Sequence, residues 1–194
     1  MPGYGKDILK FKAVIVTIML SIFAAGLSAA AQSANSPNTP YTDEKPHLGV
    51  MSCYGSTCHS RQEATGVVVQ QNEILIWQDE TSTTGAHTRA YKTLLTERSK
   101  DIVKRLGLGP AHEAKECLSC HADGIAPALR GPKFQITDGV SCESCHGSAG
   151  DWLTQHYETG SSHSKNVGLG LYPLEDAKTR AGVCLSCHLG SSAE

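Results

Sequence analysis

The cysteines of this chain come in pairs, and a histidine directly follows the second cysteine of every pair. In three of the pairs two residues separate the cysteines, which gives the pattern Cys-x-x-Cys-His. This pattern is the attachment signature of a c-type haem: both thiols bond to the haem, and the histidine becomes an axial ligand of its iron. Haem attachment is therefore predicted at Cys117, Cys120 and His121, at Cys142, Cys145 and His146, and at Cys184, Cys187 and His188.

The first cysteine pair is irregular, because four residues separate Cys53 from Cys58 before His59 follows. Gly55 and Ser56 would allow the two extra residues to bulge out while the thiols keep their reach. A disulfide between Cys53 and Cys58 is the alternative, since an exported chain meets an oxidising compartment. We expect a fourth haem here, held by Cys53, Cys58 and His59.

Two other uses of paired cysteines compete with haem attachment at the regular motifs. A disulfide framework would need the cysteines but no histidine after each pair. A zinc ribbon would match the spacing of the pairs that begin at Cys117 and Cys142. It would explain neither the histidines nor the other two pairs, so four covalently attached c-type haems remain the predicted cofactors.

The N-terminus has the pattern of a secretory signal peptide. Lysines at positions 6, 10 and 12 precede an apolar run over 13–27, and small residues follow at 28–31. We therefore predict a signal peptide over 1–31, a flexible leader over 32–46 and a tetrahaem domain over 47–194. A retained membrane anchor is the alternative for the apolar run. Cleavage would leave a periplasmic protein with no integral membrane span.

The charge of the mature chain bears on its partners. Residues 1–31 hold three lysines and one aspartate, so the 17 basic and 19 acidic side chains of the sequence become 14 and 18, a formal charge of −4. Binding to a nucleic-acid backbone needs a basic face, which excludes that class of partner. Redox proteins with a positive docking patch are the expected partners. The sequence does not indicate the oligomeric state.

The predicted fold is mainly α, a small, loop-rich multihaem cytochrome c domain built around its haems. Two tryptophans and three phenylalanines are too few for a strong side-chain core in a chain of this size, and the haems would supply the missing apolar bulk. A short strand is expected at 134–136 and a loop at 160–173. Apolar spacing and helix-stop signals predict helices near 71–77, 84–95, 99–106, 110–117, 151–156 and 175–188.

The second axial ligand of each iron must come from the remaining side chains. The mature chain has one methionine, Met51, which lies too close to Cys53 to reach across its own haem, so each iron is expected to be bis-histidine or open. His87 and His156 are the best candidates, because both lie on predicted amphipathic helices beside aromatic residues. Two further candidates, His47 and His163, lie in loops that could fold over a haem, and a fifth spare histidine, His112, is expected to point away from its own haem.

Several segments resemble the tetrahaem cytochrome c-554 family, known from electron transfer in ammonia oxidation. The resemblance runs over Gly-Ala-His-Thr-Arg-Ala at 85–90, Lys-Glu-Cys-Leu-Ser-Cys-His-Ala-Asp-Gly at 115–124 and Thr-Asp-Gly-Val-Ser-Cys-Glu-Ser-Cys-His-Gly at 137–147. It continues through His156 to the motif at 184–188. The longer first motif departs from the family pattern.

The resemblance also implies an assignment of ligands. His156 would be the distal ligand of the iron at His59, and His87 would serve the iron at His146. The iron at His121 corresponds to the one that is five-coordinate in the family. The family's fourth haem takes its distal histidine from a C-terminal extension that this sequence does not contain, which leaves His47 and His163 as candidates at His188.

Electron transfer between periplasmic redox partners is the favoured function, and an enzyme is the less favoured alternative. If the iron at His121 keeps an open position, it could act on nitric oxide, hydroxylamine or a similar small N-oxide. Asp123, Asp138 and Glu143 lie nearby in sequence but form no convincing acid–base constellation. We expect these three carboxylates to be solvated or to cap helices.

Overall fold

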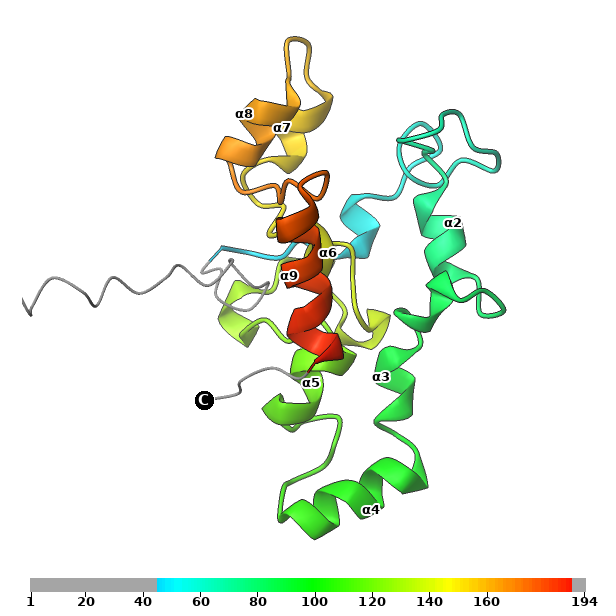
Figure 1. The fold of residues 1–194 in the computed structure, drawn as a ribbon, viewed down its shortest axis with the longest axis vertical. Helices are drawn as coiled ribbons and strands as arrows, with labels where there is room; N and C mark the ends of the chain where they lie inside the picture. Colours follow the sequence, from blue (N-terminus) through cyan, green and yellow to red (C-terminus); the bar gives the residue numbers. More distant parts are fainter. Residues whose placement is uncertain (1–44, 190–194) are drawn as a thin grey trace, which may run out of the picture. The chain divides into compact units, whose positions relative to one another are not determined.

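The computed structural model describes residues 45–189 (Figure 1). The predicted signal peptide and nearly all of the predicted leader lie outside the described residues. Within residues 45–189, no helix is both long enough and apolar enough to cross a membrane.

The described part of the chain is mainly α and rich in loops, which confirms the predicted fold class. Its residues form no β-strand, only an isolated bridge between His47 and Arg130. The α-helices are α2 (Glu73–Gln78), α3 (Ala90–Thr93), α4 (Glu97–Leu106), α5 (Lys115–His121), α6 (Glu143–His146), α7 (Leu153–Tyr157), α8 (His163–Gly168) and α9 (Ala177–His188). Short 3₁₀ turns are η1 (Val50–Ser52), η2 (Thr84–Ala86), η3 (Pro127–Leu129) and η4 (Ile136–Asp138).

Three expectations about local structure differ from what the chain adopts. The predicted strand at 134–136 is wrong, because Ile136 begins the turn η4. The predicted loop at 160–173 contains α8, whose N-terminus is capped by the Ser162 side chain. The helix expected over 84–95 is broken into η2 and α3, although Tyr91 and Leu94 are both buried.

The three regular cysteine motifs share one local structure. Helices α5, α6 and α9 end at His121, His146 and His188, the histidines of these motifs. On a helix, residues three and four positions apart lie on the same face. The two cysteines and the histidine of a Cys-x-x-Cys-His motif follow this spacing, so each helix end presents both thiols and the imidazole to one side. The longer first motif lies instead in turns that follow η1.

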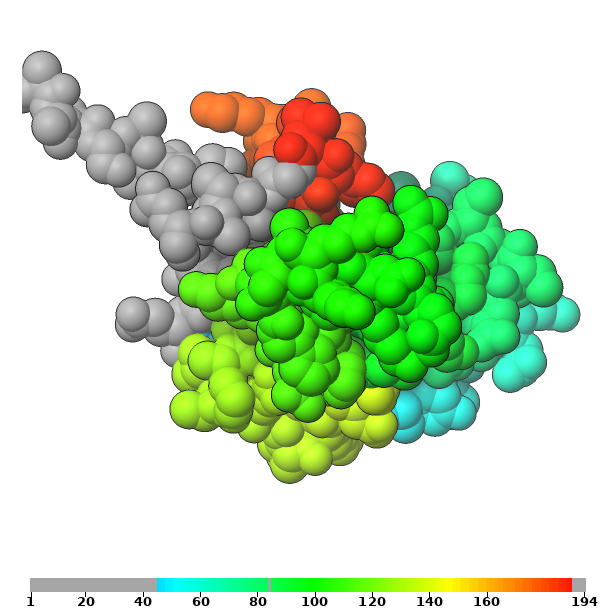
Figure 2. Space-filling model, turned by 90° about the horizontal axis from the view of Figure 1, so that it is seen from below, coloured from blue at the N-terminus to red at the C-terminus, as the bar shows by residue number. Residues whose placement is uncertain are grey.

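The apolar core of the described chain is small. Tyr91, Leu94 and Val103 pack with Ala111 and Ala122, and α5 lies against both α3 and α9. Helix α4 begins at the cap Thr96 and ends at Gly107, whose φ of 69° suits a residue without a side chain. Figure 2 looks onto α4, drawn in green, from below. The apolar side chains of Ile102 and Leu106 on this helix are exposed.

Candidate haem-binding site

The four cysteine motifs lie next to one another. The thiols of Cys53 and Cys142 are neighbours, which joins the first motif to the third, and the interaction with Cys142 lowers the pKa of Cys53. Burial, together with the nearby thiols of Cys184 and Cys187, raises the pKa of Cys145 to about 11, so the third motif neighbours the fourth. The Cys187 Sγ lies 3.6 Å from the carbonyl oxygen of Ser119, inside the second motif. The motifs thus follow one another in the spatial order first, third, fourth, second.

All eight cysteines are free thiols, and none is fully buried. The Cys53–Cys58 disulfide that competes with haem attachment is therefore not formed in this structure. Cys58 and Cys184 are exposed, whereas the other six cysteines are half-buried. No motif cysteine is therefore taken up by a disulfide.

The imidazole rings of His59 and His156 face each other. Their centres are 6.2 Å apart and their planes differ by only 15°. A ligating nitrogen stands roughly 2 Å from a transition-metal ion, so the centres of two imidazole rings on opposite sides of one ion are roughly 6 Å apart. The observed separation fits an iron between His59 and His156.

Hydrogen bonds at Nδ1 orient both rings of this pair. The His59 Nδ1 lies 2.9 Å from the Glu73 Oε2, and the His156 Nδ1 donates to the carbonyl oxygen of Leu153. Each bond leaves Nε2 as the nitrogen available to a metal, which is the usual arrangement of metal-ligating histidines. Trp152, which is buried, packs its ring edge-on against His156 with centres 5.6 Å apart.

Glu73 is held in place by its own hydrogen bonds. Burial raises the pKa of Glu73, but the hydrogen bond with His59 and those from backbone amides outweigh burial and hold the pKa below its ordinary value. The side chain therefore faces His59 as a carboxylate.

A second facing pair joins His87 to His188. Their ring centres are 6.3 Å apart, and their planes meet at 68°. Burial and the neighbouring His188 lower the pKa of His87. The expectation that His87 would serve His146 differs from this geometry, which brings His87 to the fourth motif instead. The fourth motif thereby gains a facing histidine from within residues 45–189.

The backbone that carries His87 is fixed by the loop before the third motif. The carbonyl oxygen of His87 accepts a hydrogen bond from the Val140 amide at 3.0 Å. Gly139, with a φ of 73°, makes this approach possible, because a Cβ at that position would lie 2.5 Å from the His87 carbonyl oxygen.

His121 is oriented by α3. Its Nδ1 lies 2.9 Å from the Thr93 Oγ1 and 3.2 Å from the Ala90 carbonyl oxygen. The Thr93 hydroxyl donates its own proton to Ala90 at 2.7 Å, so it accepts from His121. Within residues 45–189, neither His121 nor His146 has a second imidazole facing it. The open position expected at His121 stays a prediction.

His146 lies close to the first motif. Burial lowers the pKa of His146, and the nearby His59 lowers it further. The first and third motifs are therefore neighbours, and a distal role for His87 at His146 stays a prediction.

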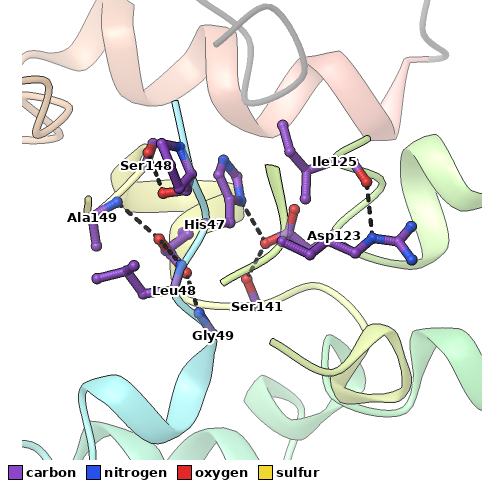
Figure 3. Close-up of polar contacts among 11 residues, drawn as sticks. His47, Leu48, Gly49, Asp123, Ile125, Ser141, Ser148 and Ala149 are labelled. Carbon is purple, nitrogen blue, oxygen red and sulfur yellow. Dashed lines mark hydrogen bonds and ion pairs between the residues drawn. The ribbon is translucent and has the colours of Figure 1, made fainter. Parts of the chain in front are cut away.

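His47 is fully buried rather than folded over the surface (Figure 3). Its Nδ1 lies 2.8 Å from the Asp123 Oδ2, which also accepts from the Ser141 hydroxyl at 2.6 Å. A carboxylate on Nδ1 is compatible with a metal on Nε2, so a distal role for His47 stays a prediction.

Two of the carboxylates that we expected to be solvated or to cap helices are buried, which corrects that expectation. Asp123 is 1% exposed and Glu143 is 2% exposed. Glu143 accepts hydrogen bonds from the amides of Leu48, Gly49 and Ala149, at 2.9, 2.7 and 2.8 Å (Figure 3). It therefore fastens the segment before the first motif onto the third. A charged residue between the two cysteines of a motif was the only sequence signal for this role.

The two other spare histidines lie in polar contacts. The His163 Nε2 is 2.7 Å from the Glu175 Oε1, and both side chains are more than half exposed. The His112 Nε2 is 3.4 Å from the Glu113 Oε1. His87, rather than His163, lies beside His188 in this structure, and a distal role for His163 stays a prediction.

Comparisons with known proteins show which family the chain resembles. The family described as "Cytochrome c554 and c-prime" matches residues 52–147, a range that includes the irregular first motif. Cytochrome c-554 of Nitrosomonas europaea is 28% identical over 155 residues, which cover 76% of this chain and 58% of the relative. No solved structure matches the chain. The motifs, the helical loop-rich fold and these matches together show that the chain belongs to the cytochrome c-554 family of multihaem c-type cytochromes.

Proposed function

We propose that this protein carries electrons through four c-type haems between redox proteins of the periplasm. The observation that carries the proposal is the presence of two facing imidazole pairs, His59 with His156 and His87 with His188, at separations of 6.2 and 6.3 Å that fit an iron. Two histidines on one iron leave no position for a substrate, so such a site is suited to electron transfer. When bound, each haem supplies an iron that gains and loses one electron.

The chain's own residues attach and orient the haems in this proposal. The eight cysteines would form the thioether bonds, and His59, His121, His146 and His188 would be the proximal ligands. His87 and His156 would be distal ligands; a hydrogen bond at Nδ1 holds the ring of His156, and a hydrogen bond from the Val140 amide holds the backbone of His87. Fixed ligands favour electron transfer, because little rearrangement then accompanies each change of charge.

The spatial order of the motifs supports transfer along the chain of haems. Contacts link the first motif to the third, the third to the fourth and the fourth to the second. Neighbouring attachment sites would keep neighbouring haems close, and an electron could pass from one end of this series to the other. The acidic net charge favours partners whose docking face is positive.

A small-molecule redox enzyme is the second candidate function. It is favoured by one observation, that no second imidazole faces His121 within residues 45–189. An iron there with an open position could bind nitric oxide or hydroxylamine. His121 would hold that iron, and Thr93 would hold the ring of His121.

The haem count is tested by the mass of the mature protein. Four haems are expected in the wild type, and the double substitution Cys53→Ala with Cys58→Ala should remove one of them. Substituting Cys184 and Cys187 in the same way is the matched control at a regular motif. A wild-type mass that corresponds to three haems would refute attachment at the first motif.

Electron transfer is separated from small-molecule chemistry by spectroscopy of the resting protein. A high-spin signal that shifts on addition of nitric oxide, and that disappears when Cys117 and Cys120 are substituted, would favour chemistry at His121. Four low-spin signals and no response to nitric oxide would support electron transfer and contradict chemistry on a small molecule. The N-terminal sequence of the mature protein and its presence in the periplasmic fraction test the signal peptide at the same time.

A further inference from the structure

His59, the histidine of the first motif, differs from the other motif histidines in the group that its Nδ1 contacts. Among the motif histidines described here, His59 alone has its Nδ1 on a carboxylate, the Oε2 of Glu73 at 2.9 Å. His121 has neutral oxygens instead, from Thr93 at 2.9 Å and Ala90 at 3.2 Å. The two proximal ligands therefore differ in the charge of the group behind them.

The carboxylate of Glu73 is built into its position. Its Oε1 accepts hydrogen bonds from the amides of Gln70 and Gln71, at 2.8 and 3.0 Å, which leaves Oε2 directed at His59. The Ile74 amide donates to the carbonyl oxygen of His59 at 3.0 Å, so the start of α2 is tied to the motif itself. Glu73 thus cannot turn away from His59 without breaking several hydrogen bonds.

Backbone strain accompanies this arrangement. Gln71 has a φ of 62°, and it is the only residue other than glycine with a positive φ within residues 45–189. Such a conformation is unfavourable for a long side chain and persists only where its surroundings hold it. Here it turns the Gln71 amide toward Glu73. The strain therefore supports a role for Glu73 beyond solvation.

We infer that Glu73 is a positioning residue that lowers the reduction potential of the haem held at the first motif. This inference rests on the proposed function, because it requires a haem at Cys53 and Cys58. A carboxylate that accepts the Nδ1 proton makes the imidazole a stronger electron donor through Nε2. A stronger donor stabilises ferric over ferrous iron, and hydrogen bonding behind a ligand is one of the levers that set haem potentials.

The inference gives electron transfer along the series of motifs a preferred direction. The iron at His59 is the more reducing end, and the iron at His121, with neutral oxygens behind its ligand, is the more oxidising end. Electrons that enter beside the first motif run downhill toward the second motif.

The test is the substitution Glu73→Gln, with the mass, the low-spin signals and the potentials measured at one pH. Glutamine keeps the size of the side chain and removes its charge. The reduction equilibrium constant of one haem should rise about tenfold, which is ~59 mV for one electron. Glu73→Asp keeps the charge on a shorter side chain, so its potential should lie between those of the wild type and Glu73→Gln. Glu175→Gln, which removes a carboxylate from the exposed His163, is the matched control and should shift no potential.

The outcomes separate the inference from the proposed function. If Glu73→Gln carries four haems with wild-type potentials, Glu73 does not tune the iron and the inference is overturned. If the wild type carries no haem at the first motif, the proposed haem count and the inference both fail. If Glu73→Gln itself does not assemble, the reciprocal substitution Thr93→Asp decides. A carboxylate behind His121 should lower the potential of that haem, and an unchanged potential would contradict the inference.

Discussion

The imidazole ring of His87 lies 6.3 Å from that of His188, centre to centre, and the two ring planes meet at 68°. The pair formed by His59 and His156 has almost the same separation, yet its planes differ by only 15°. An iron that both rings ligate would set the separation, whereas the backbone that carries each ring sets the angle. Both pairs thus consist of two histidines at similar separation, but the ring planes are nearly parallel in one pair and crossed in the other.

Two distinct low-spin ferric signals are expected from this difference. Parallel and crossed imidazole planes split the iron d orbitals differently, so the crossed pair should give the more anisotropic electron paramagnetic resonance signal. The spectrum of the oxidised protein checks this. In His156→Ala the signal of the parallel pair should disappear while the anisotropic signal remains, and loss of the anisotropic signal instead would contradict the pairing.

The substitution His87→Ala should convert the iron at His188 from low spin to high spin, because it removes the facing ligand. His163→Ala is the matched control and should leave the spectrum unchanged, since His163 is paired with Glu175 at the surface. The assignment is checked in a chain that lacks Cys184 and Cys187 and therefore one haem. His87→Ala should cause no further loss of low-spin signal there. A further loss would mean that His87 serves another iron, such as the one at His146.

Gly139→Ala should weaken the ligation by His87 without touching the ring. The added Cβ would lie 2.5 Å from the His87 carbonyl oxygen, and the φ of 73° would itself be strained. We expect a partial conversion to high spin and a lower midpoint of thermal unfolding. Gly109→Ala, where a Cβ meets nothing within 4 Å, should change neither quantity. Equal spectra for the two variants would show that the loop at Gly139 does not position His87.

Glu143→Gln should lower the free energy of unfolding by at least about 2 kcal/mol, because three backbone amides lose a charged acceptor in a buried place. Denaturant unfolding, with haem content checked by mass, measures the loss. The exposed Glu97 pairs with Lys100 at the surface, so Glu97→Gln should change stability by less than ~0.5 kcal/mol. Similar losses in both variants would argue against a fastening role for Glu143.

Local sequence patterns were sufficient to predict the family and the class of fold. The spacing of Cys117, Cys120 and His121 places three groups on one face of a helix, and a helix ends at His121 as it does at His146 and His188. Few large apolar residues also indicated a small side-chain core, which the structure confirms. The motif geometry depends on residues three or four positions apart and the size of the core on composition, so both can be predicted without knowledge of distant contacts.

Which histidines lie side by side was decided by the tertiary structure alone. His87 meets His188 rather than His146, and Glu73 reaches His59 through a turn strained at Gln71. His47 and Asp123 are buried against each other although 76 positions separate them. The physical reason is that the sequence around a histidine or carboxylate does not indicate which distant side chain it will contact. The sequence by itself determined the cysteine–histidine motifs and the class of fold, and the packing of distant loops decided which histidines lie beside those of the motifs.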